Sequence, residues 1–187
     1  MKISIIGQGK VGTALGGRLV AAGHDVVYAG RGEVRTACAD ADAIIVAATP
    51  KATHEIADAL APVAAGKVII DAMNSVSAKP DGYATSTHAF EALLPGAHVT
   101  MCFNSVGYEV MADPVFGGQR ATMFMAGDDA TAKDVARRLA LDVGFGSCED
   151  IGGSQRYETL EQVAMAWISL AIMQGKGRAF AWHLLER

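Results

Sequence analysis

The chain begins with an apolar strand that runs directly into a glycine-rich turn and then into a helix. Residues 2–6 have the strand pattern, and glycines stand at the first, third and sixth positions of the turn. Such a turn suits the pyrophosphate of a dinucleotide, because the glycines let the backbone bend and approach the ligand while the helix N-terminus presents free N–H groups. The order strand, turn, helix predicts a dinucleotide-binding fold. The expected cofactor contacts in the turn are Gly7, Gln8, Gly9, Lys10, Val11 and Gly12.

Apolar strands and helical patterns alternate along the rest of the chain. Strands are expected at 26–29, 43–49, 67–71, 98–103 and 122–126. Helices are expected at about 11–23, 34–39 and 52–60, just before Pro95, and at about 128–141 and 155–173. This alternation predicts an α/β fold of the Rossmann type, with a doubly wound, mostly parallel sheet.

The second and third strands are separated by residues 31–42 alone. A full dinucleotide fold usually places a helix, another strand and a further helix in this interval, and these residues can hold a single short helix. A right-handed crossover of that size joins the two strands that flank the first one. We therefore expect one edge strand to be trimmed, so that the second strand forms the edge of the sheet.

The chain is expected to form a single domain over residues 1–187, in which residues 155–187 are a C-terminal helical extension. The helix pattern from Gln155 to Met173 is apolar nearly all round after Val163, which predicts that it is buried against its own chain and against another subunit. A hydrophobic fraction of 51% beside 19% charged residues agrees with a homodimer.

Charge and composition exclude several classes of partner. The net charge of −4 argues against nucleic acid and an anionic membrane surface. Three cysteines and five histidines show no ligand spacing, so no metal site is expected.

The longest apolar run, Val163–Met173, is too short to span a bilayer, and the first strand leaves no room for a signal peptide. We expect a cytoplasmic protein that acts on a small molecule.

The end of the second strand indicates which nucleotide binds. NAD-binding proteins carry Asp or Glu about 20 residues after the glycine turn, where the carboxylate binds the ribose. Here the strand ends in Ala29-Gly30-Arg31, and Glu33 is the first acid. A guanidinium suits a 2′-phosphate, and Arg35 offers a second contact. The sequence therefore predicts NADP(H), with Gly30, Arg31 and Arg35 in its site.

The combination of motifs resembles the NADP oxidoreductases that depend on the deazaflavin coenzyme F-420, over nearly the whole chain. The motifs are the Gly7–Gly12 turn, residues 29–31, Ala48-Thr49-Pro50, 71–74, 103–107, 127–129, Gly144-Phe145, 151–153 and Tyr157-x-x-Leu160-Glu161. The family is also similar to the cytoplasmic domain of membrane ferric reductases. Two departures stand out: the family usually has Ser where this chain has Gly30, and the interval after Arg31 is shorter than usual.

This resemblance implies roles for residues that follow the predicted strands. Ala48, Thr49 and Pro50 are expected along the nicotinamide and its ribose, and Asn74 beside them. Phe103, Asn104 and Met111 are assigned to the pocket of the hydride acceptor, although core packing explains Met111 better. Hydride transfer between two rings needs close positioning more than a proton donor. The sequence shows no acid–base pair, and no catalytic side chain is assigned.

Three functions remain open. The first is an NADP(H)-dependent oxidoreductase that passes hydride between the nicotinamide and a flavin-like or deazaflavin acceptor. The second is a small-metabolite dehydrogenase or imine reductase related to pyrroline-carboxylate reductase, for which Lys176 is the candidate catalytic residue. The third is a non-catalytic sensor that binds NADP(H).

Overall fold

Seven strands form one sheet in the order β2-β1-β3-β4-β5-β8-β9. The computed structural model describes residues 1–187. The strands are β1 (Lys2–Ile6), β2 (Asp25–Ala29), β3 (Ala43–Val46), β4 (Val68–Asp71), β5 (His98–Cys102), β8 (Thr122–Ala126) and β9 (Ser147–Asp150). The first five are parallel, β8 is antiparallel to β5, and β9 is parallel to β8. The predicted α/β class with a mostly parallel sheet is confirmed.

The edge beside β1 has the predicted trimmed form. β2 pairs with β1 alone and ends the sheet. The single short helix between β2 and β3 is α2 (Val34–Cys38). It leads the chain back past β1 to β3 on the other side, as a right-handed crossover does.

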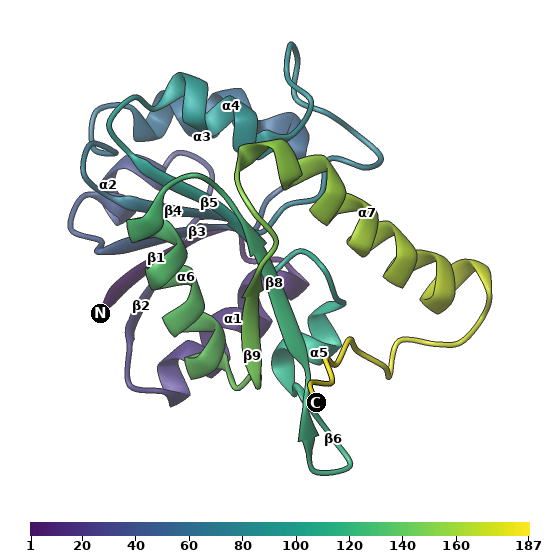
Figure 1. The fold of residues 1–187 in the computed structure, drawn as a ribbon. Coiled ribbons are helices and arrows are strands. Elements are labelled where there is room, and N and C mark those ends of the chain that lie inside the picture. Colours follow the sequence, from purple (N-terminus) through teal and green to yellow (C-terminus); the bar gives the residue numbers. More distant parts are fainter.

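Helices cover both faces of the sheet (Figure 1). One face carries α1 (Lys10–Ala21), α5 (Tyr108–Ala112) and α6 (Ala130–Val143), and the other carries α2, α3 (Thr53–Leu60) and α4 (Ser86–Leu93). The sequence of β3 is continuously apolar because both of its faces are buried. Ala43 and Ile45 pack into one core, and Ile44 and Val46 pack into the other. A parallel strand buried on both faces has this pattern.

Several elements differ from the sequence prediction. The strand expected at 43–49 ends at Val46, because the chain then turns into a 3-10 helix at Pro50–Ala52 before α3. The sequence pattern did not reveal α5, the hairpin of β6 (Val115–Phe116) and β7 (Gln119–Arg120), or β9. These are short, and β9 has the polar sequence expected of an edge strand.

The C-terminal part consists of a 3-10 turn (Ser154–Arg156), α7 (Tyr157–Ile168) and a π-helical turn (Ser169–Met173). The expected helical extension over 155–187 is thus helical only to Met173. Residues 174–187 return to the sheet (Figure 1), where the Thr122 N–H donates to the Trp182 carbonyl at 2.8 Å.

Only one face of α7 is buried within this chain, and the expectation that another subunit covers the remaining face stays a prediction. The buried residues of α7 and the π-helical turn are Tyr157, Leu160, Glu161, Ala164, Trp167 and Ala171. Ile172 and Met173 are 57% and 66% exposed. No helix in the structure combines the length and apolarity needed to cross a membrane.

Candidate functional site

The glycine turn between β1 and α1 is closely packed at Gly7 and Gly12 and open at Gly9. Gly7 has φ of +106°, and a Cβ there would lie 2.4 Å from the Ala47 carbonyl oxygen. A Cβ at Gly12 would lie 2.1 Å from the Gly7 carbonyl oxygen, so this position holds the helix close to the turn. Gly9 differs, because nothing lies within 4 Å of a Cβ placed there. Its open side leaves the backbone accessible to a ligand.

The N-terminus of α1 is suited to an anion. Gly9 is the N-cap, no side chain caps the helix, and no acid lies in its first turn. The first N–H groups therefore lack partners within the helix, and the positive end of the helix dipole adds to their effect. Gln8 and Lys10 are exposed, and Val11 is half-buried. The Lys10 ammonium lies 5.0 Å from the centroid of the Tyr108 ring, at the start of α5.

The other predicted site residues follow strands whose carboxyl ends meet at the same edge. Ile6 pairs with Val46, Val46 with Asp71, and Asp71 with Met101. Open parallel sheets bind ligands outside this edge. Ala48, Thr49 and Pro50 continue from β3, and all three are half-buried or exposed.

Two of the predicted residues contact each other at this edge. The Asn74 Nδ2 donates to the Asn104 carbonyl at 2.8 Å, and the Asn104 Nδ2 donates to the Asn74 Oδ1 at 3.2 Å. The Asn104 Oδ1 is buried and has no hydrogen-bond partner. A buried amide oxygen without a donor is costly in a folded protein.

Phe103, which directly precedes Asn104 in the sequence, has a strained backbone. Phe103 is the one non-glycine residue with positive φ, at +64°. Such conformations cluster at functional sites. The Phe103 and Met111 side chains are 0% and 1% exposed, within the core of the α1 face. They therefore pack in the interior, and their assignment to the acceptor pocket stays a prediction.

The end of β2 carries the predicted specificity residues. Arg31 and Arg35 are exposed, and the Arg31 Nε lies 3.5 Å from the Glu55 carboxylate. The Gly30 N–H donates to the Glu33 Oε2 at 3.1 Å. The sequence identified Glu33 as the first acid after the strand, but it gave no sign that its carboxylate folds back onto the strand end.

A buried polar network supports the segment that carries Asn74. The Asp71 carboxylate accepts from the Ser86 Oγ at 2.5 Å, the Thr87 Oγ1 at 2.7 Å and the Met73 N–H at 2.9 Å. Burial raises the pKa of Asp71 to about 6, although these hydrogen bonds oppose the shift. The network was not predicted. Its one signal in the sequence is an acid that ends an apolar strand.

The C-terminal segment reaches the same region. The Arg178 guanidinium forms an ion pair with Glu109 at 2.5 Å and lies 5.3 Å from the Tyr108 ring centroid, the ring that Lys10 also contacts. Lys176 lies in an exposed turn with its ammonium 5.8 Å from the Phe180 ring. No cluster of three or more His, Cys, Asp or Glu side chains is arranged to hold a metal ion.

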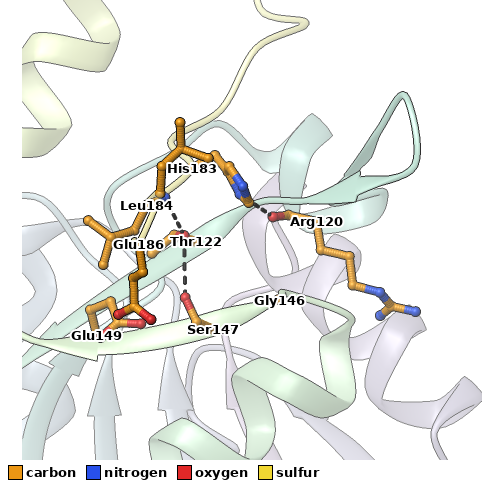
Figure 2. A pocket seen from close by; sticks show the side chains of 9 residues that line it. Arg120, Thr122, Gly146, Ser147, Glu149, His183, Leu184 and Glu186 are labelled. Carbon is orange, nitrogen blue, oxygen red and sulfur yellow. Dashed lines mark hydrogen bonds between the residues drawn. The ribbon is translucent and has the colours of Figure 1, made fainter.

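A cavity of about 490 Å³ lies away from the glycine turn, between β8, β9 and the C-terminal segment (Figure 2). The Leu184 N–H and the Ser147 hydroxyl both donate to the Thr122 Oγ1 at its centre, at 3.0 and 3.3 Å. None of the predicted site residues lines it. Its lining residues are Arg120, Thr122, Gly146, Ser147, Glu149, His183, Leu184, Leu185 and Glu186.

Comparisons with known proteins connect this geometry to a group of solved structures. No family model and no curated protein matches the chain. A proposed F-420-dependent NADP reductase from Arthrobacter sp. FB24 matches over 100% of both chains, with a TM-score of 0.87 and 22% identity. A hypothetical protein from Sinorhizobium meliloti matches at TM-score 0.65 and 26% identity, over 82% of this chain and 85% of the other.

A reductive aminase from Aspergillus terreus, solved with NADPH and ethyl levulinate, also has a related fold. It matches at TM-score 0.64 and 20% identity, over 94% of this chain. The chain spans 60% of the length of that enzyme. Over its whole length, then, this chain has the Rossmann-type fold of the Arthrobacter protein, a fold that it shares in part with the NADPH-bound aminase.

Proposed function

We propose that the protein is an NADP(H)-dependent oxidoreductase that transfers hydride between the nicotinamide and a flavin-like or deazaflavin acceptor. The observation that carries this proposal is the open Gly9 backbone at the uncapped N-terminus of α1, beside a strand edge where Asn74 and Asn104 pair. The full-length likeness to a proposed F-420-dependent NADP reductase supports the same acceptor class.

The residues present fit a dinucleotide. The N–H groups of the glycine turn and Lys10 would bind the pyrophosphate, and Arg31 and Arg35 are exposed for a 2′-phosphate. Thr49 and Pro50 would lie along the nicotinamide and its ribose. When bound, the cofactor supplies the hydride.

The Asn74–Asn104 pair would orient polar groups near the nicotinamide, at the carboxyl edge of the sheet. The buried Asn104 Oδ1 is free to accept a hydrogen bond there, and such a bond fixes the position of a ring without any proton transfer.

The second candidate is a reductase of imines or small carbonyl compounds, favoured by the fold shared with the reductive aminase. Its candidate residue Lys176 lies in an exposed turn after the π-helical segment. A Lys176→Ala variant with unchanged turnover would exclude this residue as the catalyst. A sensor function predicts tight cofactor binding with no oxidation by any acceptor.

One experiment separates the three functions. The protein is incubated with NADPH and, in turn, a deazaflavin, a flavin, a quinone, a ferric chelate and an imine, and the loss of nicotinamide absorbance is followed. Turnover with the deazaflavin or flavin supports the proposal. Turnover with the imine alone supports the metabolite reductase, and binding without turnover supports the sensor.

A further inference from the structure

The Glu33 carboxylate occupies the end of β2, next to the glycine turn. The Gly7 N–H donates to the Ala29 carbonyl at 3.2 Å, which ties the turn to this strand end. One residue further on, Gly30 and Glu33 form a reciprocal pair. The Gly30 N–H donates to the Glu33 Oε2, and the Glu33 N–H donates to the Gly30 carbonyl, both at 3.1 Å. The carboxylate is thereby fixed where the chain leaves the sheet.

The glycine at position 30 makes room for this carboxylate. A Cβ on Gly30 would lie 3.0 Å from the Glu33 Oε2, which is tighter than an ordinary contact. Any larger residue at this position would therefore press against the carboxylate. The end of β2 thus presents a negative acceptor, and position 30 offers no side-chain donor.

The charges around Arg31 are balanced by this arrangement. Arg31 and Arg35 are exposed, but Glu33 lies at the strand end and Glu55 lies 3.5 Å from the Arg31 Nε. A carboxylate at the end of the second strand accepts hydrogen bonds from the hydroxyls of an adenosine ribose and repels a phosphate on the same ribose. The site therefore contains one group for each form of the cofactor.

We propose that Glu33 is a specificity-determining residue that lets the site accept NAD(H) as well as NADP(H). This inference rests on the proposed function, because it assumes that a dinucleotide binds at the glycine turn. The Glu33 carboxylate receives the ribose hydroxyls of NAD(H), and Arg31 receives the 2′-phosphate of NADP(H). The wild-type preference for NADPH is then modest, below about tenfold, because Glu33 opposes the phosphate.

A Glu33→Gln variant tests the charge alone, because the amide oxygen of Gln still accepts from the Gly30 N–H. We expect NADPH to bind about three- to tenfold more tightly and NADH to bind more weakly, since unit charges a few ångströms apart at a protein surface interact with about this strength. Dissociation constants are measured by nicotinamide fluorescence. Glu158→Gln, on the exposed side of α7, is the control and should change neither constant.

A Gly30→Ala variant tests the same idea by a different route, because it adds a Cβ without a hydroxyl donor. Its Cβ displaces the Glu33 carboxylate, so the ratio of NADPH to NADH affinity should rise as in Glu33→Gln. If the wild type binds NADPH but both variants leave this ratio within twofold, the role of Glu33 is overturned and the proposed function stands. If the wild type binds neither dinucleotide, the proposed function itself fails.

Discussion

The Glu161 carboxylate on α7 accepts a hydrogen bond from the Ser75 backbone N–H at 2.8 Å, across 86 positions of sequence. Glu161 is 4% exposed, and Ser75 directly follows the Asn74 that pairs with Asn104. Ser75 is also bound to α4, because its hydroxyl accepts from the Ser86 N–H at 3.1 Å. The C-terminal helix thus fixes the segment that carries a predicted cofactor contact.

This relationship predicts a functional effect at a distance. Glu161→Ala leaves the Ser75 N–H buried without a partner, which costs about 1–3 kcal/mol of unfolding free energy. Because Asn74 then loses its support, KM for NADPH should rise. Glu161→Gln keeps an acceptor oxygen and should restore most of both properties. Denaturant unfolding and steady-state kinetics are the two measurements. Equal kinetics for the Ala and Gln variants would contradict the positioning role.

Gly9 and Gly12 should respond in opposite ways to alanine. A Cβ at Gly12 meets the Gly7 carbonyl oxygen at 2.1 Å, so Gly12→Ala should lower the unfolding free energy by roughly 1–3 kcal/mol, as overpacking does. Gly9→Ala meets nothing within 4 Å and should leave stability within about 0.5 kcal/mol. It should nevertheless weaken NADPH binding, because the methyl group lies where we expect the pyrophosphate to approach. Thermal unfolding and cofactor titration of both variants provide the comparison. Normal cofactor affinity in Gly9→Ala would place the phosphates elsewhere.

Stability should depend on pH through Asp71. Burial raises its pKa from 3.8 to about 6, so the folded state binds more protons than the unfolded state between these values. The contribution of Asp71 to stability therefore falls as pH rises from about 4 to 6 and is constant above that. Two pKa units correspond to about 3 kcal/mol.

An Asp71→Asn variant isolates this effect from the other carboxylates. The variant carries no charge to bury, so its stability relative to the wild type should increase as pH rises from 4 to 7. Urea unfolding of both proteins across this range measures the difference. A difference that stays constant with pH would show that Asp71 is not the titrating group.

The local periodicity of the sequence was sufficient to predict the parallel part of the sheet. The strands from β1 to β5 and the trimmed edge at β2 were predicted, because buried parallel strands are continuously apolar and the interval 31–42 is too short for another strand. Asn74 and Asn104 were placed at one edge by the same reasoning, since parallel strand ends meet there, but their hydrogen bonds to each other were not predicted. β9 was not predicted, because its sequence Ser-Cys-Glu-Asp lacks an apolar run.

The contacts that the sequence did not reveal are those made by side chains that fold back or cross between elements. Nothing in the local pattern joins Glu161 to Ser75, and the spacing of Gly30 and Glu33 fits an exposed loop equally well. Exposed and buried acids look alike in a sequence. Their partners depend on tertiary packing, which propensity and periodicity do not encode.

Arg31 should discriminate between the two nicotinamide cofactors. Its side chain is 85% exposed and is expected to pair with the 2′-phosphate, so NADPH should bind more tightly than NADH. Arg31→Ala should weaken NADPH binding by about 1–3 kcal/mol and leave NADH binding unchanged, because a hydrogen bond to a charged group has this strength. Arg138→Ala, an exposed arginine on α6, is the matched control. An unchanged affinity for NADPH in Arg31→Ala would overturn the phosphate assignment.

The exposed apolar end of the C-terminal helix predicts a homodimer. Ile172 and Met173 are 57% and 66% exposed, and Leu170 beside them is 38% exposed. Contiguous exposed apolar side chains at a helix end mark an interaction surface, and a two-fold axis lets the same patch meet its copy. Ile172→Asp with Met173→Asp should therefore yield a monomer by light scattering at micromolar concentration. Val20→Asp, at a residue that is 56% exposed on α1, should leave the dimer intact. A monomeric mass for the wild type would disprove the association, and dissociation by Val20→Asp alone would move the interface to α1.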